Sequence, residues 1–197
     1  MSAPRLQARA WANRVVVEPP ARLLLALHIH PNAITVAGFA VAVGAAYLLA
    51  AGRPLWVGGL VMLAGASLDL YDGAVARLGG KESTFGAMLD SVLDRLSEIA
   101  VLFGLLVFYV RGADDVGAYL AFGALAASLM VSYLRARSEG LGVPGDVGLM
   151  GRPERIVVLG AGLLLGQPSW ALGIIAALAS LTVVQRAVHV WRAGRSA

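Results

Sequence analysis

Long apolar stretches recur along this chain from about residue 33 to residue 191. Of its 197 residues, 58% are hydrophobic and only 14% are charged. These proportions exclude a disordered chain and an ordinary soluble protein. Because about 20 consecutive apolar residues cross a bilayer as a helix, the pattern predicts an all-α integral membrane protein.

Turn residues divide the apolar sequence into six runs, and each run is expected to be a transmembrane helix. The turns around Pro54 and Pro168 are the clearest of these breaks. The fifth run is the shortest and has few purely apolar residues. The runs cover residues 33–51, 55–78, 85–110, 117–134, 156–165 and 169–190. We therefore expect a six-helix transmembrane domain over residues 31–194.

Residues 1–30 differ from the rest because arginines alternate there with short apolar groups. This pattern is too broken for a signal peptide. It predicts an amphipathic juxtamembrane segment that lies on the membrane surface. The Pro19–Pro20 pair is expected to bend it.

The basic residues are distributed unevenly over the predicted topology. Six spans place both termini on one side, together with the loops near residues 80 and 140. That side carries 14 of the 16 basic residues, and only Arg53 and Arg111 lie opposite. By the positive-inside rule it is cytoplasmic, which predicts a multi-pass protein of the cell membrane with both termini in the cytoplasm.

Two further classes are excluded by composition. Aromatic residues make up 7% of the chain and lie within the apolar runs, so the net charge of +4 does not indicate a nucleic-acid partner. The chain has no cysteine. Disulfides, thiolate catalysis and cysteine-ligated zinc or iron–sulfur sites are therefore ruled out.

Acidic residues occur where contact with lipid would make them costly. Five of the 12 acidic residues lie in the second and third runs, although one deep in a span costs on the order of 3 kcal/mol. At about 100° per residue, the pair Asp69 and Asp72 and the pair Asp90 and Asp94 each share a helix face. An antiparallel hairpin of the two helices would bring these four carboxylates together near its cytoplasmic end. Glu98 is the fifth acidic residue.

Four converging carboxylates carry too much like charge to remain ionised without a partner. Oxygen ligands favour Mg²⁺ or Mn²⁺ over zinc, and four carboxylates suffice for two ions. Two-metal sites characteristically act on phosphoryl groups. The alternative is a structural role, in which the aspartates pair with Arg77 and Arg95 and hold the helices together.

The spacing of these residues matches in full the signature D-x2-D-G-x2-A-R-x8-G-x3-D-x3-D. Eight fixed positions over 26 residues make the match specific. The positions are Asp69, Asp72, Gly73, Ala76, Arg77, Gly86, Asp90 and Asp94. The chain therefore resembles the CDP-alcohol phosphotransferases, also called CDP-alcohol phosphatidyltransferases, over almost its whole length. The resemblance implies that residues 31–194 transfer a group from a CDP-linked lipid to an alcohol and release CMP.

The family also implies roles for individual residues. A pair of Mg²⁺ or Mn²⁺ ions would be bound by the four aspartates, and Asp94 would in addition take the proton of the acceptor hydroxyl. The CDP-lipid, either CDP-diacylglycerol or an ether-lipid analogue, would contact a further set of residues. These are Asn32, Ala33, Ile34, Thr35, Gly73, Arg77 and Ser83.

A second group of motifs bears on the acceptor alcohol. Residues 132–139, 145–148, 152–155 and 184–186 resemble the phosphatidylinositol phosphate synthases of actinobacteria and their archaeal relatives. That resemblance implies inositol 1-phosphate as the acceptor. The arginines in these motifs suit such a ligand, because a guanidinium binds a phosphate monoester bidentately. The position that corresponds to Arg135 is a lysine in the phosphatidylinositol phosphate synthases that the chain resembles. The candidate phosphate-binding residues are Arg135, Arg152, Arg155 and Arg186.

Several alternatives stay open at this point. The arginines could be positive-inside anchors. A phosphatidylglycerophosphate synthase would use glycerol 3-phosphate, but residues 35–39 lack the arginine that those enzymes usually carry in the first span. A cation-coupled transporter and a membrane prenyltransferase are more remote, because the acidic residues cluster at one end of one hairpin. The family also implies a homodimer among membrane lipids, and Gly104, Gly117 and Gly123 are candidates for its interface.

Overall fold

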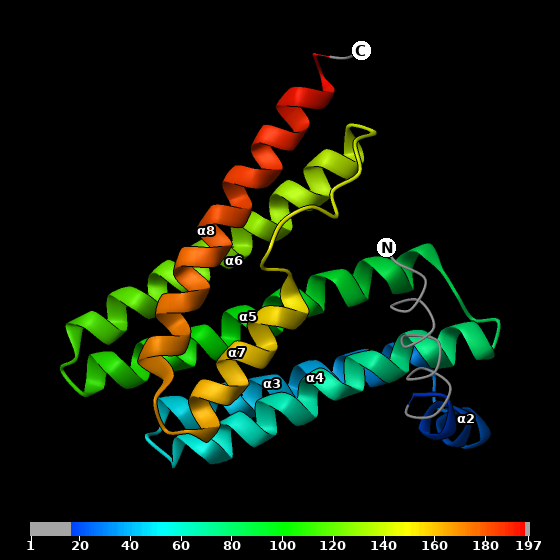
Figure 1. The fold of residues 1–197 in the computed structure, drawn as a ribbon. Coiled ribbons are helices and arrows are strands. Elements are labelled where there is room, and N and C mark those ends of the chain that lie inside the picture. The colour runs from blue at the N-terminus through cyan, green and yellow to red at the C-terminus, as the bar shows by residue number, and fades with distance from the viewer. Residues whose placement is uncertain (1–16, 196–197) are drawn as a thin grey trace.

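Residues 17–195 are described by the computed structural model, so residues 1–16 of the expected amphipathic segment lie outside it. All regular secondary structure in the described residues is helical, and these residues form no strand (Figure 1). Its helices are α2 Glu18–Ala26, α3 Pro31–Ala50, α4 Leu55–Leu78, α5 Thr84–Arg111, α6 Asp115–Gly140, α7 Arg152–Leu164 and α8 Pro168–Ala193. The helices α3 to α8 correspond one by one to the predicted apolar runs.

Within residues 17–195, four helices are long and apolar enough to cross a membrane, namely α3, α4, α6 and α8. Helix α5 has 28 residues, but its first half carries the charged residues of the third run. Helix α7 has only 13 residues, or about 20 Å of helix. The all-helical membrane architecture is therefore confirmed with four candidate spans, and the count of six spans stays a prediction.

The helix ends alternate between two ends of the bundle. The loops at 51–54, 112–114 and 165–167 lie together at the lower left of Figure 1. The turn between α4 and α5 and the start of α3 lie at the other end. The Pro19–Pro20 pair occupies the first turn of α2. A proline has no N–H to lose at this position and its fixed φ suits a helix start. A bend between this helix and residues 1–16, which lie outside the described residues, stays a prediction.

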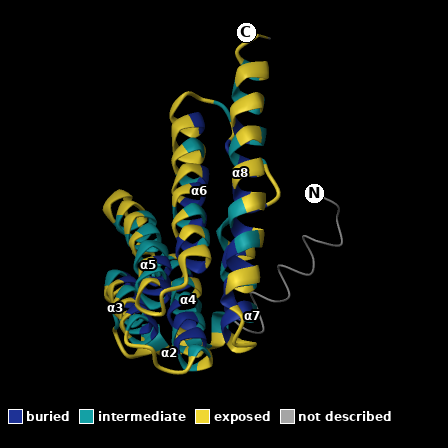
Figure 2. Cartoon of the chain, turned by 90° about the vertical axis from the view of Figure 1, so that its left-hand side faces the viewer, coloured by how far each residue is buried: buried dark blue, intermediate teal, exposed yellow. Residues whose placement is uncertain are grey.

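The core forms where helices α3 to α8 meet, and Figure 2 shows buried residues concentrated on their facing sides. Helix α3 packs along α4 and α5, α6 packs along α8, and α7 joins α4 to α8. Fully buried leucines fill the centre; these are Leu49, Leu102, Leu105, Leu163 and Leu172. The C-terminal ends of α6 and α8 extend beyond the other helices in both views.

Small residues let the helices approach at points that the sequence analysis assigned to a dimer. A Cβ at Gly104 would lie 2.5 Å from the carbonyl oxygen of Ala46, and one at Gly117 would lie 2.1 Å from the Tyr109 ring. Gly123 faces Ala176 of α8 at 3.8 Å. Gly104 and Gly117 are therefore used in packing within the chain, whereas Gly123 is only half-buried at an ordinary contact distance, and its place in a dimer interface stays a prediction.

We expect Gly104→Ala to destabilise the protein by about 1–3 kcal/mol, because the new methyl would force α5 away from the backbone of α3. Thermal unfolding of the detergent-purified protein measures the change. Gly44→Ala on α3 is the matched control, since nothing lies within 4 Å of a Cβ there. Equal stability of the two variants would show that α3 and α5 do not pack this closely.

Candidate active site

Two of the four aspartates lie on α4 and two on α5, near the turn that joins these helices. Asp72 is the most deeply placed, with 4% of its surface exposed. Its carboxylate accepts a hydrogen bond from Thr35 Oγ1 at 2.7 Å and another from the Gly73 N–H at 2.5 Å. The first turns of α3 therefore orient a carboxylate of α4.

The Asp69 carboxylate fits against α3 because residue 38 has no side chain. A Cβ at Gly38 would lie 2.9 Å from Asp69 Oδ1. A Cβ at Gly65, one turn before Asp69, would likewise lie 3.2 Å from the carbonyl oxygen of Gly38. The paired glycines therefore bring α3 and α4 together directly beneath the acidic cluster.

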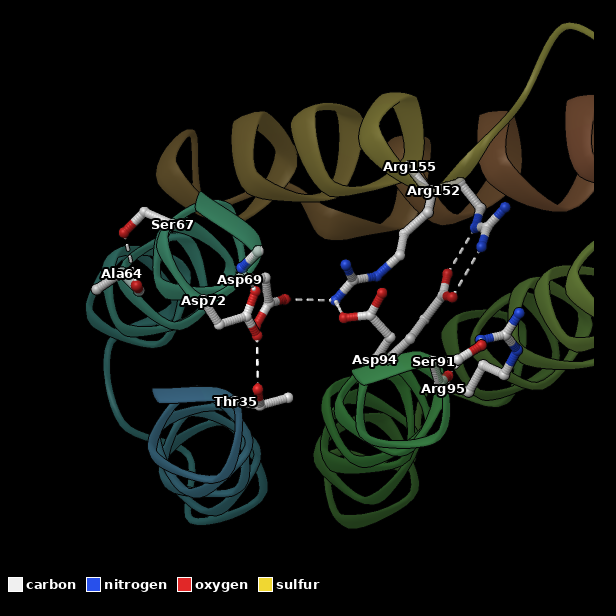
Figure 3. Close-up of polar contacts among 12 residues, drawn as sticks. Thr35, Ala64, Ser67, Asp69, Asp72, Ser91, Asp94, Arg95, Arg152 and Arg155 are labelled. Carbon is white, nitrogen blue, oxygen red and sulfur yellow. Dashed lines mark hydrogen bonds and ion pairs between the residues drawn. The ribbon is translucent and has the colours of Figure 1, made fainter. Parts of the chain in front are cut away.

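The guanidinium of Arg152, at the start of α7, lies between the carboxylates of α4 and α5 (Figure 3). Its Nη2 is 2.7 Å from Asp69 Oδ2 and 2.7 Å from Asp94 Oδ1. Arg95 instead turns to Ser91, where its Nη1 donates to the hydroxyl oxygen at 2.6 Å and to the carbonyl oxygen. The aspartates thus do form ion pairs, but the cation is Arg152 of α7 and not Arg77 or Arg95.

A cavity of about 200 Å³ opens beside Asp72, at the ends of α3, α4 and α5. We call it the small cavity. Ser83 caps α5 at its edge, with Oγ accepting from the Gly86 N–H at 3.0 Å. Five of the seven residues expected to contact the CDP-lipid line it, namely Asn32, Thr35, Gly73, Arg77 and Ser83. Ala33 is exposed, and Ile34 is buried in the contact between α2, α3 and α4, so neither faces this cavity.

A second cavity, of about 660 Å³, lies on the other side of the aspartates, between α5, α6, α7 and α8. We call it the large cavity. The residues expected to bind the acceptor phosphate all line it, namely Arg135, Arg152, Arg155 and Arg186. Asp94 lines it too, and Asp90 borders both cavities. Asp72, Asp90 and Asp94 therefore stand where the two cavities meet.

The four arginines differ in how they are held. Arg155 is buried and forms a bidentate pair with Glu98, at 2.5 and 2.8 Å. Arg186 is also buried, but it donates to the carbonyl oxygens of Val147 and Val131, at 2.8 and 2.5 Å. Arg135 pairs with Glu139 on its own helix, with both side chains half exposed.

Glu98 has no role in the motifs of the sequence, whereas in the structure it is the partner of Arg155. Its position carried a signal, because Glu98 follows Asp94 by one helical turn and must share its face. No sequence pattern indicates that the carbonyl groups of Val131 and Val147 accept hydrogen bonds from Arg186. Val147 belongs to the irregular segment 141–151, whose path depends on the packing of α6 against α8.

The donor set at the aspartates suits a hard divalent cation, because it consists of carboxylate oxygens from two facing helices. Asp69 and Asp94 already share one positive group, the Arg152 guanidinium. Within residues 17–195, no three acidic or histidine side chains lie in metal-ligand geometry. The four aspartates thus fit a metal site in chemistry and position, with an arginine at its centre.

Comparisons with known proteins agree with this geometry. The family model for CDP-alcohol phosphatidyltransferases matches residues 28–191. An archaetidylinositol phosphate synthase of Methanothermobacter thermautotrophicus is 39% identical over 81% of this chain and 82% of its own. A phosphatidylinositol phosphate synthase of Corynebacterium glutamicum is also 39% identical, over 89% of this chain and 84% of its own.

Solved structures lead to the same group. The phosphatidylinositol phosphate synthase of Mycobacterium tuberculosis with CDP-DAG bound has a TM-score of 0.81 and 32% identity, covering 89% of this chain and 94% of that one. The same enzyme in complex with manganese and citrate also has a TM-score of 0.81 and 32% identity, over 88% of each chain. Fold, motif and sequence therefore agree that the chain belongs to the CDP-alcohol phosphatidyltransferase family.

Proposed function

We propose that the protein transfers the phosphatidyl group of CDP-diacylglycerol to inositol 1-phosphate, giving phosphatidylinositol phosphate and CMP. The observation that carries this proposal is the position of the acidic cluster between two cavities, which Asp72, Asp90 and Asp94 line. One cavity is lined by the motif residues assigned to the nucleotide and the other by four arginines. Membership of this enzyme family leaves the transporter and prenyltransferase hypotheses without support.

The large cavity suits a phosphorylated polyol by size and charge. Its volume of about 660 Å³ is typical of a small-molecule site. Among its arginines, Arg186 is buried, and its guanidinium donates hydrogen bonds to two backbone carbonyl oxygens. A guanidinium has five N–H donors, so these contacts orient it without exhausting it. A phosphate dianion would supply the negative charge that this buried cation needs.

The names of the relatives support the choice of acceptor. The relatives that match most of this chain include an archaetidylinositol phosphate synthase and a phosphatidylinositol phosphate synthase. We extend their acceptor to this chain, with CDP-diacylglycerol as the donor because it is bound in the mycobacterial structure. Mg²⁺ or Mn²⁺, two ions in all, would bind at Asp69, Asp72, Asp90 and Asp94, and would stabilise negative charge on the diphosphate.

The chain's own groups then have defined tasks in an in-line displacement. The residues of the small cavity hold CDP, and the arginines of the large cavity hold the acceptor with a hydroxyl toward the aspartates. The acceptor oxygen bonds to the lipid-bearing phosphorus as the bond from that phosphorus to the CMP oxygen breaks. Asp94, which lines the large cavity, takes the hydroxyl proton. No covalent enzyme intermediate is needed.

The membrane arrangement follows the same proposal. Helices α3 to α8 would form six spans or partial spans, with both termini and the aspartates on the cytoplasmic side of the cell membrane. The donor's tails can then remain among membrane lipids while the soluble acceptor enters from water. A homodimer also remains part of the proposal.

The test is CMP release from CDP-diacylglycerol by the purified protein with Mg²⁺, comparing inositol 1-phosphate, glycerol 3-phosphate, free inositol and serine. We expect turnover with inositol 1-phosphate and loss of all turnover in EDTA, restored by Mg²⁺ or Mn²⁺. Turnover with glycerol 3-phosphate instead would keep the aspartate site and overturn the acceptor. No CMP release with any acceptor or metal would overturn the transferase itself.

A further inference from the structure

Arg152 touches both halves of the site. It lines the large cavity with the other arginines, and it also reaches the aspartates. A third, inner cavity of about 40 Å³ lies deeper, with Asp69, Glu98 and Arg152 on its polar side. One side chain at the start of α7 thus stands at the boundary between the acidic cluster and the arginine-lined cavity.

The hydrogen bonding of Arg152 is incomplete. Only its Nη2 contacts the carboxylates, and the contact with Asp94 Oδ1 is an ion pair without hydrogen-bond geometry. Its Nε is buried and has no hydrogen-bond partner among the described residues. Arg155, one turn later on the same helix, uses Nε, Nη1 and Nη2 at once. Arg155 is therefore held as a fixed structural pair and Arg152 is not.

The charges explain why such a contact would be temporary. Arg152 contacts two of the four carboxylates, and among the described residues Asp72 and Asp90 have no ion pair within 4.0 Å. Divalent cations compete for the same oxygens, and once they are bound they repel a guanidinium between them. The large cavity is the adjoining space that Arg152 already lines, and a phosphate there would offer it a bidentate partner.

We propose that Arg152 is a switching counter-ion: it bridges Asp69 and Asp94 while the metal ligands are free, and it moves to the acceptor phosphate when divalent cations take those carboxylates. The inference rests on the proposed function and deepens it. Arg152 acts here as a positioning residue, because it makes the arginine-lined cavity complete only after the metal ligands are occupied. Metal binding and acceptor binding then strengthen each other, and the coupling is reciprocal.

Binding of Mn²⁺ alone tests the first half. The full chain is purified in detergent, and its Mn²⁺ affinity is measured by titration for the wild type, Arg152→Gln and Arg135→Gln. We expect Arg152→Gln to bind Mn²⁺ about tenfold more tightly, since the competing cation is gone. Arg135→Gln is the matched control and should not change, because Arg135 contacts Glu139 and not the aspartates. Unchanged or weaker Mn²⁺ binding by Arg152→Gln would overturn the inference.

Binding of a phosphate monoester tests the second half. Inositol 1-phosphate and glycerol 3-phosphate are titrated by calorimetry with and without Mn²⁺. In the wild type we expect Mn²⁺ to raise the affinity of the bound ester about tenfold. Arg152→Gln should lose most of this gain, whereas Arg135→Gln should weaken binding by the same factor in both conditions. An equal gain in Arg152→Gln and the wild type, or no ester binding in any state, would overturn the switch.

These outcomes separate the two proposals. If inositol 1-phosphate is turned over but Arg152→Gln keeps the full Mn²⁺ gain, the function stands and the switch fails. If inositol 1-phosphate gives no CMP, yet glycerol 3-phosphate shows an Mn²⁺ gain that Arg152→Gln loses, the acceptor is wrong and the switch stands.

Discussion

Asp94→Asn is expected to lower CMP release by about a thousandfold. An amide cannot take the acceptor's proton, and positioned proton transfer contributes roughly 10²–10⁴ in rate. The change also removes one charge from the metal ligands and one ion-pair partner of Arg152. The measurement is the turnover of CDP-diacylglycerol with saturating acceptor and Mg²⁺.

Two controls show where the loss arises. Asp115→Asn makes the same chemical change at an exposed position at the opposite end of the bundle, and full activity is expected. The Mn²⁺ affinity of Asp94→Asn separates a lost ligand from a lost base: affinity near that of the wild type with activity gone identifies proton transfer. More than a tenth of the wild-type rate in Asp94→Asn would contradict the assignment of Asp94 as the base.

Arg155→Leu is expected to destabilise the folded protein by about 3–5 kcal/mol, because it leaves the carboxylate of Glu98 without its buried partner. The pair joins α5 to α7 through two short hydrogen bonds, and only 2% of the Arg155 side chain is exposed. Denaturant or thermal unfolding in detergent measures the loss.

The double variant Glu98→Leu with Arg155→Leu is the sharper test. Removing both charges together should restore most of the stability, since the cost of a broken buried pair is the charge left behind. Arg135→Leu breaks the half-exposed pair with Glu139 and should cost no more than about 1 kcal/mol. A double variant as unstable as Arg155→Leu would show that packing, and not the unmatched carboxylate, sets the stability.

The helices could be predicted from the sequence because lipid demands long apolar runs. The second run matches α4 at both ends, and the third matches α5 to within one residue. The fourth run was expected to end at residue 134, whereas α6 continues to Gly140. Hydropathy marks the part of a helix that suits lipid, and the last turns of α6 carry arginines that belong in water.

The acidic cluster could be predicted in the same way, from helical periodicity and the motif spacing. The partner of that cluster could not. Arg152 follows Asp69 by 83 residues, and nothing local in the sequence specifies that α7 starts beside α4 and α5. Arg77 and Arg95 were the alternative partners because they are close to the aspartates in sequence. A cation that is close along the chain need not lie on the same helix face as the aspartates.

The position of Arg152 also bears on how the protein is assembled in the membrane. The hairpin of α4 and α5 precedes α7 in the chain, so its aspartates are synthesised before the cation that bridges two of them. Until α7 is in place, these carboxylates must stay in contact with interfacial water or become protonated, because an unpaired charge in lipid is costly. The charge of the acidic cluster is therefore partly neutralised by a cation from a helix that is made later.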